Sequence, residues 1–265
     1  MAARQARLVA GGTPHHVIQR GNRRQKVFFE KKDREHYLLL FEEKARKYKV
    51  EVWAYCLMDN HVHLVVVPGE EKALAQAIGE THKEYTRMVN FRERWRGYLW
   101  EGRFKSFIVD EKYLYAAVRY VERNPVRARI VQRAEDYEWS SARIHVEKRL
   151  NSLLSSFYLL DEIENWSEYL KDEDREEDLR LFRRHGESGR PLGDPGRLMQ
   201  LAVKYGWDLM PKKAGTKTNN SIFRGLQYWQ KYQPGSHCIL LHGGKAHEIM
   251  HERTSLLPWT EVANL

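Results

Sequence analysis

The chain has 265 residues, of which 42% are hydrophobic, and its formal net charge is +9. This length accommodates one catalytic domain with an appendage, or two small domains, and the apolar content suffices for a packed core. No apolar run approaches the ~18 residues of a membrane span, and the two cysteines, Cys56 and Cys238, lack CxxC spacing. The composition therefore argues against a membrane-bound, secreted or disulfide-rich protein. It predicts a cytoplasmic protein with a polyanionic partner, most commonly nucleic acid.

The charge is unevenly distributed along the chain. Residues 161–178 contain ten acidic side chains against only Lys171 and Arg175, so the remainder of the chain is more basic than the total suggests. A basic body with one acidic segment is typical of proteins that handle DNA or RNA.

The first 110 residues predict strands that alternate with amphipathic helices. Residues 12–29 indicate a strand (HHVIQ), a turn around Gly21-Asn22 and a second strand (VFF). After the front hairpin, the pattern predicts a helix at 31–48, a strand pair within 50–67, a helix at 70–92 and a strand at 103–109. A bend at Asp59-Asn60 divides the strand pair.

A third helix is expected from about Glu111 to Arg123, with Asp110 as its N-cap. The resulting order, β-α-β-β-α-β-α with a front hairpin, indicates an α+β fold with a ferredoxin-like antiparallel sheet and helices packed on it. Beyond residue 141 the pattern becomes helical and charged, which predicts a helical C-terminal extension. We therefore expect a catalytic domain at 1–145, a helical and partly acidic accessory region at 146–210, and a basic linker with an unassigned tail at 211–265.

His61-Val62-His63 lies inside a run with strand character, Val50 to Val67, which ends at Pro68. Because side chains on a strand alternate between faces, His61 and His63 point the same way, about 6–7 Å apart. This spacing suits one divalent cation. In a chain with 12 histidines, the same pair could instead be half-buried side chains that only satisfy hydrogen bonds.

The third helix brings a second group of polar residues. Its apolar stripe is Leu114, Ala117, Val118 and Val121, and Tyr120 and Asn124 lie beside it, one turn apart. If the helix packs across the histidine face, both side chains reach the cation. A tyrosine hydroxyl and a divalent ion together suit phosphodiester transesterification through a covalent phosphotyrosine. The alternatives are that Tyr120 fills the helix–sheet interface and that Asn124, which precedes Pro125, is a helix N-cap.

Five stretches of the sequence form a recognisable set: HHVIQRGNRRQKVFF at 15–29, AYCLMDNHVHLVVVP at 54–68, YLWEGRFKSFIVD at 98–110, RYVERNPVRARIV at 119–131 and WSS at 139–141. In their order and spacing, they resemble the single-tyrosine transposases of the His-hydrophobic-His nuclease superfamily, and in particular the REP-associated tyrosine transposases of bacteria. GRPLG at 189–193 and PKK at 211–213 also resemble the C-terminal region of longer members.

The resemblance implies a role for each matching residue. His61 and His63 correspond to the metal-binding pair, Tyr120 to the nucleophile and Asn124 to a third metal ligand, with Mg²⁺ or Mn²⁺ as the cofactor. Asp59 stands where the family usually has proline, which adds an acid near the metal. The expected DNA contacts are Arg20, Asn22, Arg23, Arg24, Arg103 and Lys105.

The expected substrate is single-stranded DNA with REP-like hairpins, bound by a monomer or a homodimer. Three other interpretations stay open. The chain could be a domesticated hairpin-binding protein that no longer cuts. It could also be a replication initiator or relaxase, although no GxxxxGK[ST] loop is present. A metallohydrolase would need further ligands, for which only Asp59 is an obvious candidate.

Overall fold

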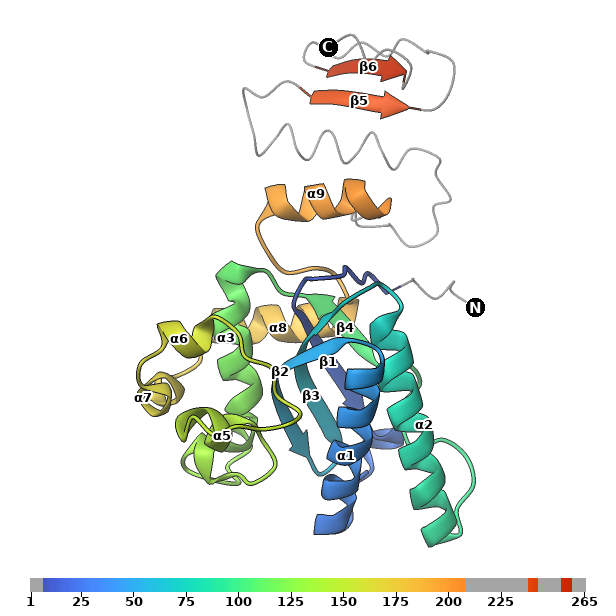
Figure 1. Cartoon of the computed structure of the whole chain (residues 1–265), viewed down its shortest axis with the longest axis vertical. Helices are drawn as coiled ribbons and strands as arrows, with labels where there is room; N and C mark the ends of the chain where they lie inside the picture. The colour runs from blue at the N-terminus through green and yellow to red at the C-terminus, as the bar shows by residue number, and fades with distance from the viewer. Residues whose placement is uncertain (1–6, 208–237, 243–253, 259–265) are drawn as a thin grey trace. The chain divides into compact units, whose positions relative to one another are not determined.

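A computed structural model describes residues 7–207, 238–242 and 254–258, and Figure 1 shows the arrangement of its elements. The core of the fold is a four-stranded sheet in the order β2-β3-β1-β4, in which every neighbouring pair is antiparallel. This is the strand order of a ferredoxin-like α+β fold, so the predicted fold class is confirmed. The strands are β1 (His15–Arg20), β2 (Val50–Met58), β3 (His61–Pro68) and β4 (Lys105–Ile108).

Two long helices cover one face of the sheet, and a third helix lies on the other side (Figure 1). Inward side chains such as Val17, Leu57 and Leu64 pack with the first pair of helices, whereas Cys56, Val65 and Phe107 pack with the third. The three helices are α1 (Lys31–Lys47), α2 (Ala73–Glu93) and α3 (Glu111–Glu122). The β3 side chains that face α3 therefore include the histidine pair, because His61, His63 and Val65 alternate with Val62 and Leu64.

The helical extension packs on the same side of the sheet as α3. Phe157, Trp166 and Phe182 belong to the same apolar cluster as Leu114 and Val118 of α3. The extension begins with short elements and continues with longer helices: α4 (Asn124–Arg127), η2 (Ala134–Asp136), α5 (Ala142–Val146), α6 (Leu159–Glu162), α7 (Trp166–Lys171), α8 (Glu176–Ser188) and α9 (Pro195–Tyr205).

Two sequence stretches beyond α3 attach to the sheet through backbone bonds. The Leu57 amide donates to the Trp139 carbonyl over 2.8 Å, which places the WSS stretch beside β2. Leu192, within GRPLG, forms a parallel bridge with Val109 beyond the end of β4.

Most of the predicted elements agree with the structure. The bend at Asp59-Asn60 separates β2 from β3, and Oδ1 of Asp110 accepts a hydrogen bond from the Lys112 amide over 2.9 Å, as expected of an N-cap. All four residues of the predicted apolar stripe of α3 are buried.

The second strand of the predicted front hairpin is wrong. Residues 27–29 are not a strand, and a 3₁₀ helix, η1 (Asn22–Arg24), follows β1. The amides of Val27 and Phe28 both donate to the Asp59 carbonyl, so they do not pair with a strand. The side chains of Val27 and Phe28 are buried in the core under α1 and α2. These loop residues are therefore apolar, as the residues of a buried strand would be.

The chain divides into two compact units, residues 1–205 and 206–265. In the second unit, β5 (Cys238–His242) pairs in parallel with β6 (Thr254–Pro258). The predicted linker at 211–220 lies outside the described residues, and the predicted domain boundaries stay predictions. Within the described ranges, no helix is both long enough and apolar enough to cross a membrane.

Candidate functional site

Three histidines lie together on the face of the sheet that α3 covers. His61 and His63 share this face of β3, and their ring centroids are 5.0 Å apart. His16 reaches the same place from β1, because Ile18 pairs with His63 and His16 is two residues before Ile18. Nε2 of His16 lies 2.9 Å from Nδ1 of His63. His16 is not predicted from the sequence, because its position follows only from the strand register.

Burial keeps the imidazoles of this cluster neutral. Desolvation, together with a smaller contribution from the nearby Arg20 cation, lowers the pKa of His61 to about 4. Desolvation also places the pKa of His63 well below its ordinary value, with additional repulsion from His61 and His16. Both rings are therefore unprotonated at neutral pH, which is the form that binds a metal ion.

Hydrogen bonds orient the two rings of the pair. The amide nitrogen of Asn60 donates to the Arg24 carbonyl over 3.0 Å, so its oxygen faces the ring of His61. Nδ1 of His61 donates to that oxygen over 2.6 Å. Since Nδ1 of His63 is engaged with His16, the Nε2 atoms of His61 and His63 are the ones left to bind a cation.

Tyr120, in the last turn of α3, lies against this cluster. Its ring centroid is 5.8 Å from that of His63 and 5.6 Å from that of His16, and the residue is 9% exposed. The guanidinium of Arg127 lies 4.0 Å from the centre of the Tyr120 ring and donates to the Tyr120 carbonyl over 2.5 Å. Phe182 of α8 packs on the ring with centroids 5.0 Å apart. The structure therefore places Tyr120 next to His63, and both residues line one groove together with His61.

Asn124 is the first residue of α4 and does not act as its N-cap. Its amide nitrogen donates to the carbonyls of Tyr120 and Val121, over 3.2 and 3.3 Å. Because those carbonyls can only accept, the carboxamide oxygen faces away from them. This geometry removes the capping alternative and leaves the oxygen able to bind a cation.

These side chains line one open groove of about 370 Å³. Its cationic residues outnumber its acidic ones, Glu101 and Glu187, so the groove favours an anionic ligand. The lining residues are Ile18, Gln19, Arg20, His61, His63, Glu101, Arg103, Lys105, Tyr120, Asn124, Arg127, Phe182, Arg183, Gly186 and Glu187.

Of the predicted DNA contacts, Arg20, Arg103 and Lys105 line this groove, whereas Asn22, Arg23 and Arg24 do not. The latter three form η1, where Arg23 and Arg24 are exposed. The Arg24 carbonyl nevertheless accepts from Asn60, which holds His61.

The groove offers few protein ligands for a divalent cation. In the part of the chain that the structure describes, no group of three or more His, Cys, Asp or Glu side chains is arranged to bind a metal ion. Asp59 is engaged elsewhere, since it pairs with Arg34 and, over 3.3 Å, with Lys26. His61, His63 and Asn124 would supply two nitrogens and one oxygen, and a phosphate oxygen and water could complete the set.

Arg127 and Phe182 were not singled out by the sequence analysis. Arg127 lies in the stretch RYVERNPVRARIV, seven residues after Tyr120, and this helical spacing could have indicated its contact. Phe182 carries no such signal, because it reaches Tyr120 only through the packing of α8 on β1 and β4. Gly186 allows this approach: a Cβ atom there would lie 2.9 Å from Cδ1 of Ile18.

Residues 12–124 match the family described as IS200-like transposases. One similar solved structure is a REP-associated tyrosine transposase bound to a REP hairpin, with 19% identity, 59% of this chain and 93% of that chain covered, and a TM-score of 0.48. Another is a candidate transposase from Deinococcus radiodurans R1, with 19% identity, 49% and 94% coverage, and a TM-score of 0.31. Among curated proteins, no match is found.

The expected resemblance to transposases is confirmed by this family match. All the residues expected to do chemistry, His61, His63, Tyr120 and Asn124, fall within the matched region or at its end.

Proposed function

We propose that the protein is a single-tyrosine transposase of REP-associated type, which nicks and rejoins single-stranded DNA beside a hairpin. The observation that carries this proposal is the position of Tyr120 against His63, in a cationic groove that His61 also lines. The family match supports a transposase, and the chain's net charge of +9 supports a nucleic-acid partner.

In the proposed reaction, the hydroxyl oxygen of Tyr120 attacks a DNA phosphorus. A bond forms between this oxygen and phosphorus, the P–O3′ bond breaks, the phenol gives up its proton and the leaving 3′ oxygen takes one up. The product is a 5′-phosphotyrosine and a free 3′-hydroxyl. Because one phosphodiester replaces another, a 3′-hydroxyl can reverse the step and join strands without an external energy source.

The protein's own residues would position the reactants. Arg127 contacts the ring of Tyr120 and donates to its backbone carbonyl, and Asn124 donates to the same carbonyl. Arg20, Arg103 and Lys105 would neutralise phosphates along the groove. A Mg²⁺ or Mn²⁺ ion bound by His61, His63 and Asn124 would polarise a nonbridging oxygen of the attacked phosphate.

The test is the formation of a covalent adduct. The full chain is incubated with labelled single-stranded oligonucleotides that carry an imperfect hairpin, in the presence of Mn²⁺, and analysed by denaturing electrophoresis. We expect an adduct with the wild type and with Tyr113→Phe, a matched α3 tyrosine outside the groove, and none with Tyr120→Phe. An adduct that persists in Tyr120→Phe would reject the nucleophile.

The second candidate is a domesticated hairpin-binding protein that does not cut. The buried position of Tyr120, under Phe182, is the observation that favours it. Hairpin binding that is unchanged by a chelator, with no adduct under any divalent metal, would select this alternative over the transposase.

A further inference from the structure

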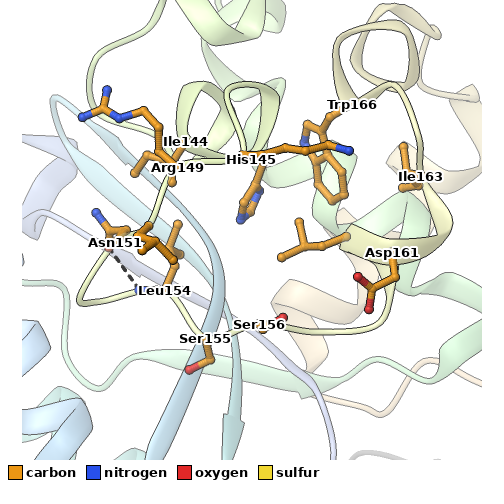
Figure 2. A pocket seen from close by; sticks show the side chains of 13 residues that line it. Ile144, His145, Arg149, Asn151, Leu154, Ser155, Ser156, Asp161, Ile163 and Trp166 are labelled. Carbon is orange, nitrogen blue, oxygen red and sulfur yellow. Dashed lines mark hydrogen bonds between the residues drawn. The ribbon is translucent and has the colours of Figure 1, made fainter.

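Two pockets outside the groove around Tyr120 differ in their charge. One lies in the helical extension, around His145 (Figure 2). Both signs of charge line it, since Arg149 and Asp161 are among its residues, and Arg149 pairs with Glu147 over 3.1 Å. The charge of this pocket therefore favours no particular ligand.

The other pocket, of about 460 Å³, is lined mainly by α2 and by residues 97–104, and we call it the α2 pocket. Four cations line it, and within the described part of the chain no acidic side chain does. The cations are Arg7, Lys83, Arg87 and Arg103. A hollow with this lining attracts anions.

The two cations on α2 are not compensated by the acids of their own helix. Lys83 and Arg87 are exposed and lie one turn apart, and within the described ranges neither forms an ion pair. The neighbouring acids, Glu80 and Glu84, pair instead with lysines of α1, over 3.0 and 2.9 Å. The positive charge on this face of α2 is therefore available to a ligand.

The other two cations repel each other. The guanidinium of Arg7 lies 3.8 Å from the centre of the Phe104 ring and donates to the Phe104 carbonyl over 3.4 Å. Burial lowers the pKa of Arg7, and the nearby Arg103 cation lowers it as well. An anion bound between these two guanidinium groups would relieve their repulsion.

Gly79 leaves the surface of α2 bare beside these cations. It lies in the middle of the helix, where glycine is less favourable than alanine. A Cβ atom there would meet nothing within 4 Å, so packing inside the protein does not require the glycine. A glycine in this position allows a ligand to approach the helix closely.

Tyr98 adds a flat aromatic surface to the α2 pocket. It is 86% exposed, so its ring is not used in the core. The adjacent Leu99 carbonyl accepts from the Asn22 amide over 2.8 Å, which attaches this segment to the end of β1. An exposed ring beside several cations is the combination with which proteins bind unpaired nucleotides, because bases stack on the ring and phosphates contact the cations.

The α2 pocket is continuous with the groove around Tyr120. Arg103 lines both of them. The chain between them is fixed to the sheet, because the Glu101 amide donates to the Arg20 carbonyl over 2.8 Å. One strand can therefore pass from the groove over Arg103 into the α2 pocket.

We propose that the α2 pocket binds an unpaired segment of the DNA strand that enters the groove, with a base stacked on Tyr98 and phosphates contacting Lys83, Arg87 and Arg103. The identity of the strand rests on the proposed function. The segment is unpaired because a base inside a duplex has no free face for Tyr98.

The test measures binding without cleavage. Full-length Tyr120→Phe, without divalent metal, is titrated into a labelled blunt hairpin and into the same hairpin with unpaired flanks, and fluorescence anisotropy is recorded. Lys83→Gln combined with Arg87→Gln should weaken binding of the flanked hairpin at least tenfold. The slope of log K against log salt concentration should become shallower by about 1.4, since each phosphate contact to a single strand contributes about 0.7. Binding of the blunt hairpin should not change.

The matched control is Lys32→Gln combined with Lys49→Gln. It removes two exposed lysines that line neither the α2 pocket nor the groove. This variant should bind the flanked hairpin as the parent protein does.

Two further variants test the aromatic surface and the bare helix. Tyr98→Ala should weaken binding of the flanked hairpin roughly fivefold or more. Its control, Phe91→Ala, removes a ring that is 88% exposed but does not line the pocket, and should have no effect. Gly79→Leu should also weaken binding at least fivefold without lowering the thermal midpoint, because leucine favours the helix and meets no neighbour.

Four results would overturn the proposal: no saturable binding of the flanked hairpin by the parent, unchanged affinity in Lys83→Gln with Arg87→Gln, an equal loss in the lysine control, or an equal loss with the blunt hairpin. Because every protein in the test carries Tyr120→Phe, the outcome does not depend on cleavage. A wild type that forms no adduct rejects the proposed chemistry alone, whereas adduct formation with unchanged affinity in the pocket variants rejects the α2 pocket alone.

Discussion

Nε2 of His16 lies 2.9 Å from Nδ1 of His63, so a histidine of β1 is hydrogen-bonded to a histidine of β3. The ring of His16 also makes an edge contact with Phe107 and with Tyr120, which fixes its own orientation. His16 thus connects the expected metal ligand to the expected nucleophile without itself facing the groove.

From this relationship we expect His16→Phe to lower the affinity for Mn²⁺ by roughly 10–100-fold, the usual effect of losing the group that orients a ligand. Phenylalanine keeps the ring contacts, so the thermal midpoint should change little. Calorimetric titration of Mn²⁺ measures the effect. His82→Phe is the control, because His82 is also buried but stacks on Trp100, on the α2 side of the sheet. Equal Mn²⁺ affinities in all three proteins would remove His16 from the site.

Asn124 allows its two possible roles to be separated. Asn124→Asp keeps an oxygen for the cation but loses the amide hydrogens that hold the Tyr120 and Val121 carbonyls, whereas Asn124→Ala loses both. If the oxygen is a ligand, Mn²⁺ affinity should fall in Asn124→Ala and be retained or increased in Asn124→Asp. Adduct formation at saturating Mn²⁺ reports positioning separately. Identical Mn²⁺ affinity in Asn124→Ala and the wild type would show that this residue only positions Tyr120.

The sequence was sufficient to predict those parts of the site that depend on one element at a time. The alternation of β3 puts His61 and His63 on one face, and the apolar stripe of α3 puts Tyr120 at its edge. The sequence was insufficient where two distant elements meet. His16 needs the β1–β3 register, and Phe182 needs the docking of α8. Val27 and Phe28 show the opposite error, since buried loop residues have the same composition as a strand.

The carboxylate of Asp174 forms ion pairs with three arginines between α3 and α4. Its carboxylate is 2.8 Å from Arg127, 3.3 Å from Arg123 and 3.8 Å from Arg119, and it is 7% exposed. Asp174→Asn removes the charge that compensates these partly buried cations, so we expect the free energy of unfolding to fall by about 1–3 kcal/mol. Urea denaturation measures this change.

The matched control is Asp172→Asn. Asp172 pairs with Arg119 over 3.3 Å but is 71% exposed, so its loss should cost no more than about 0.5 kcal/mol. Equal effects of the two substitutions would show that burial of Asp174 does not strengthen the cluster. Because Arg127 also holds Tyr120, Asp174→Asn should additionally slow adduct formation, and Asp172→Asn should not.

Acid should destabilise the protein well before its carboxylates titrate. Desolvation lowers the pKa of His15 and His61 to about 4, and that of His16 and His82 to about 3. In the unfolded chain these imidazoles take up protons near pH 6.5, while the folded protein keeps them neutral. Between pH 6.5 and about 4 the unfolded state therefore binds more protons, so stability is lost as the pH falls through this window.

Each such imidazole should lower the free energy of unfolding by about 1.4 kcal/mol per pH unit within that window. Urea denaturation between pH 7 and 5, without divalent metal, measures the slope and stays above the range in which carboxylates such as Asp33, whose pKa is lowered, begin to protonate. His82→Phe should reduce the slope by about one proton's contribution, because phenylalanine cannot be protonated in either state. A free energy of unfolding that is constant from pH 7 to 5 would mean that these buried rings titrate normally. Burial would then not explain why His61 and His63 are neutral metal ligands.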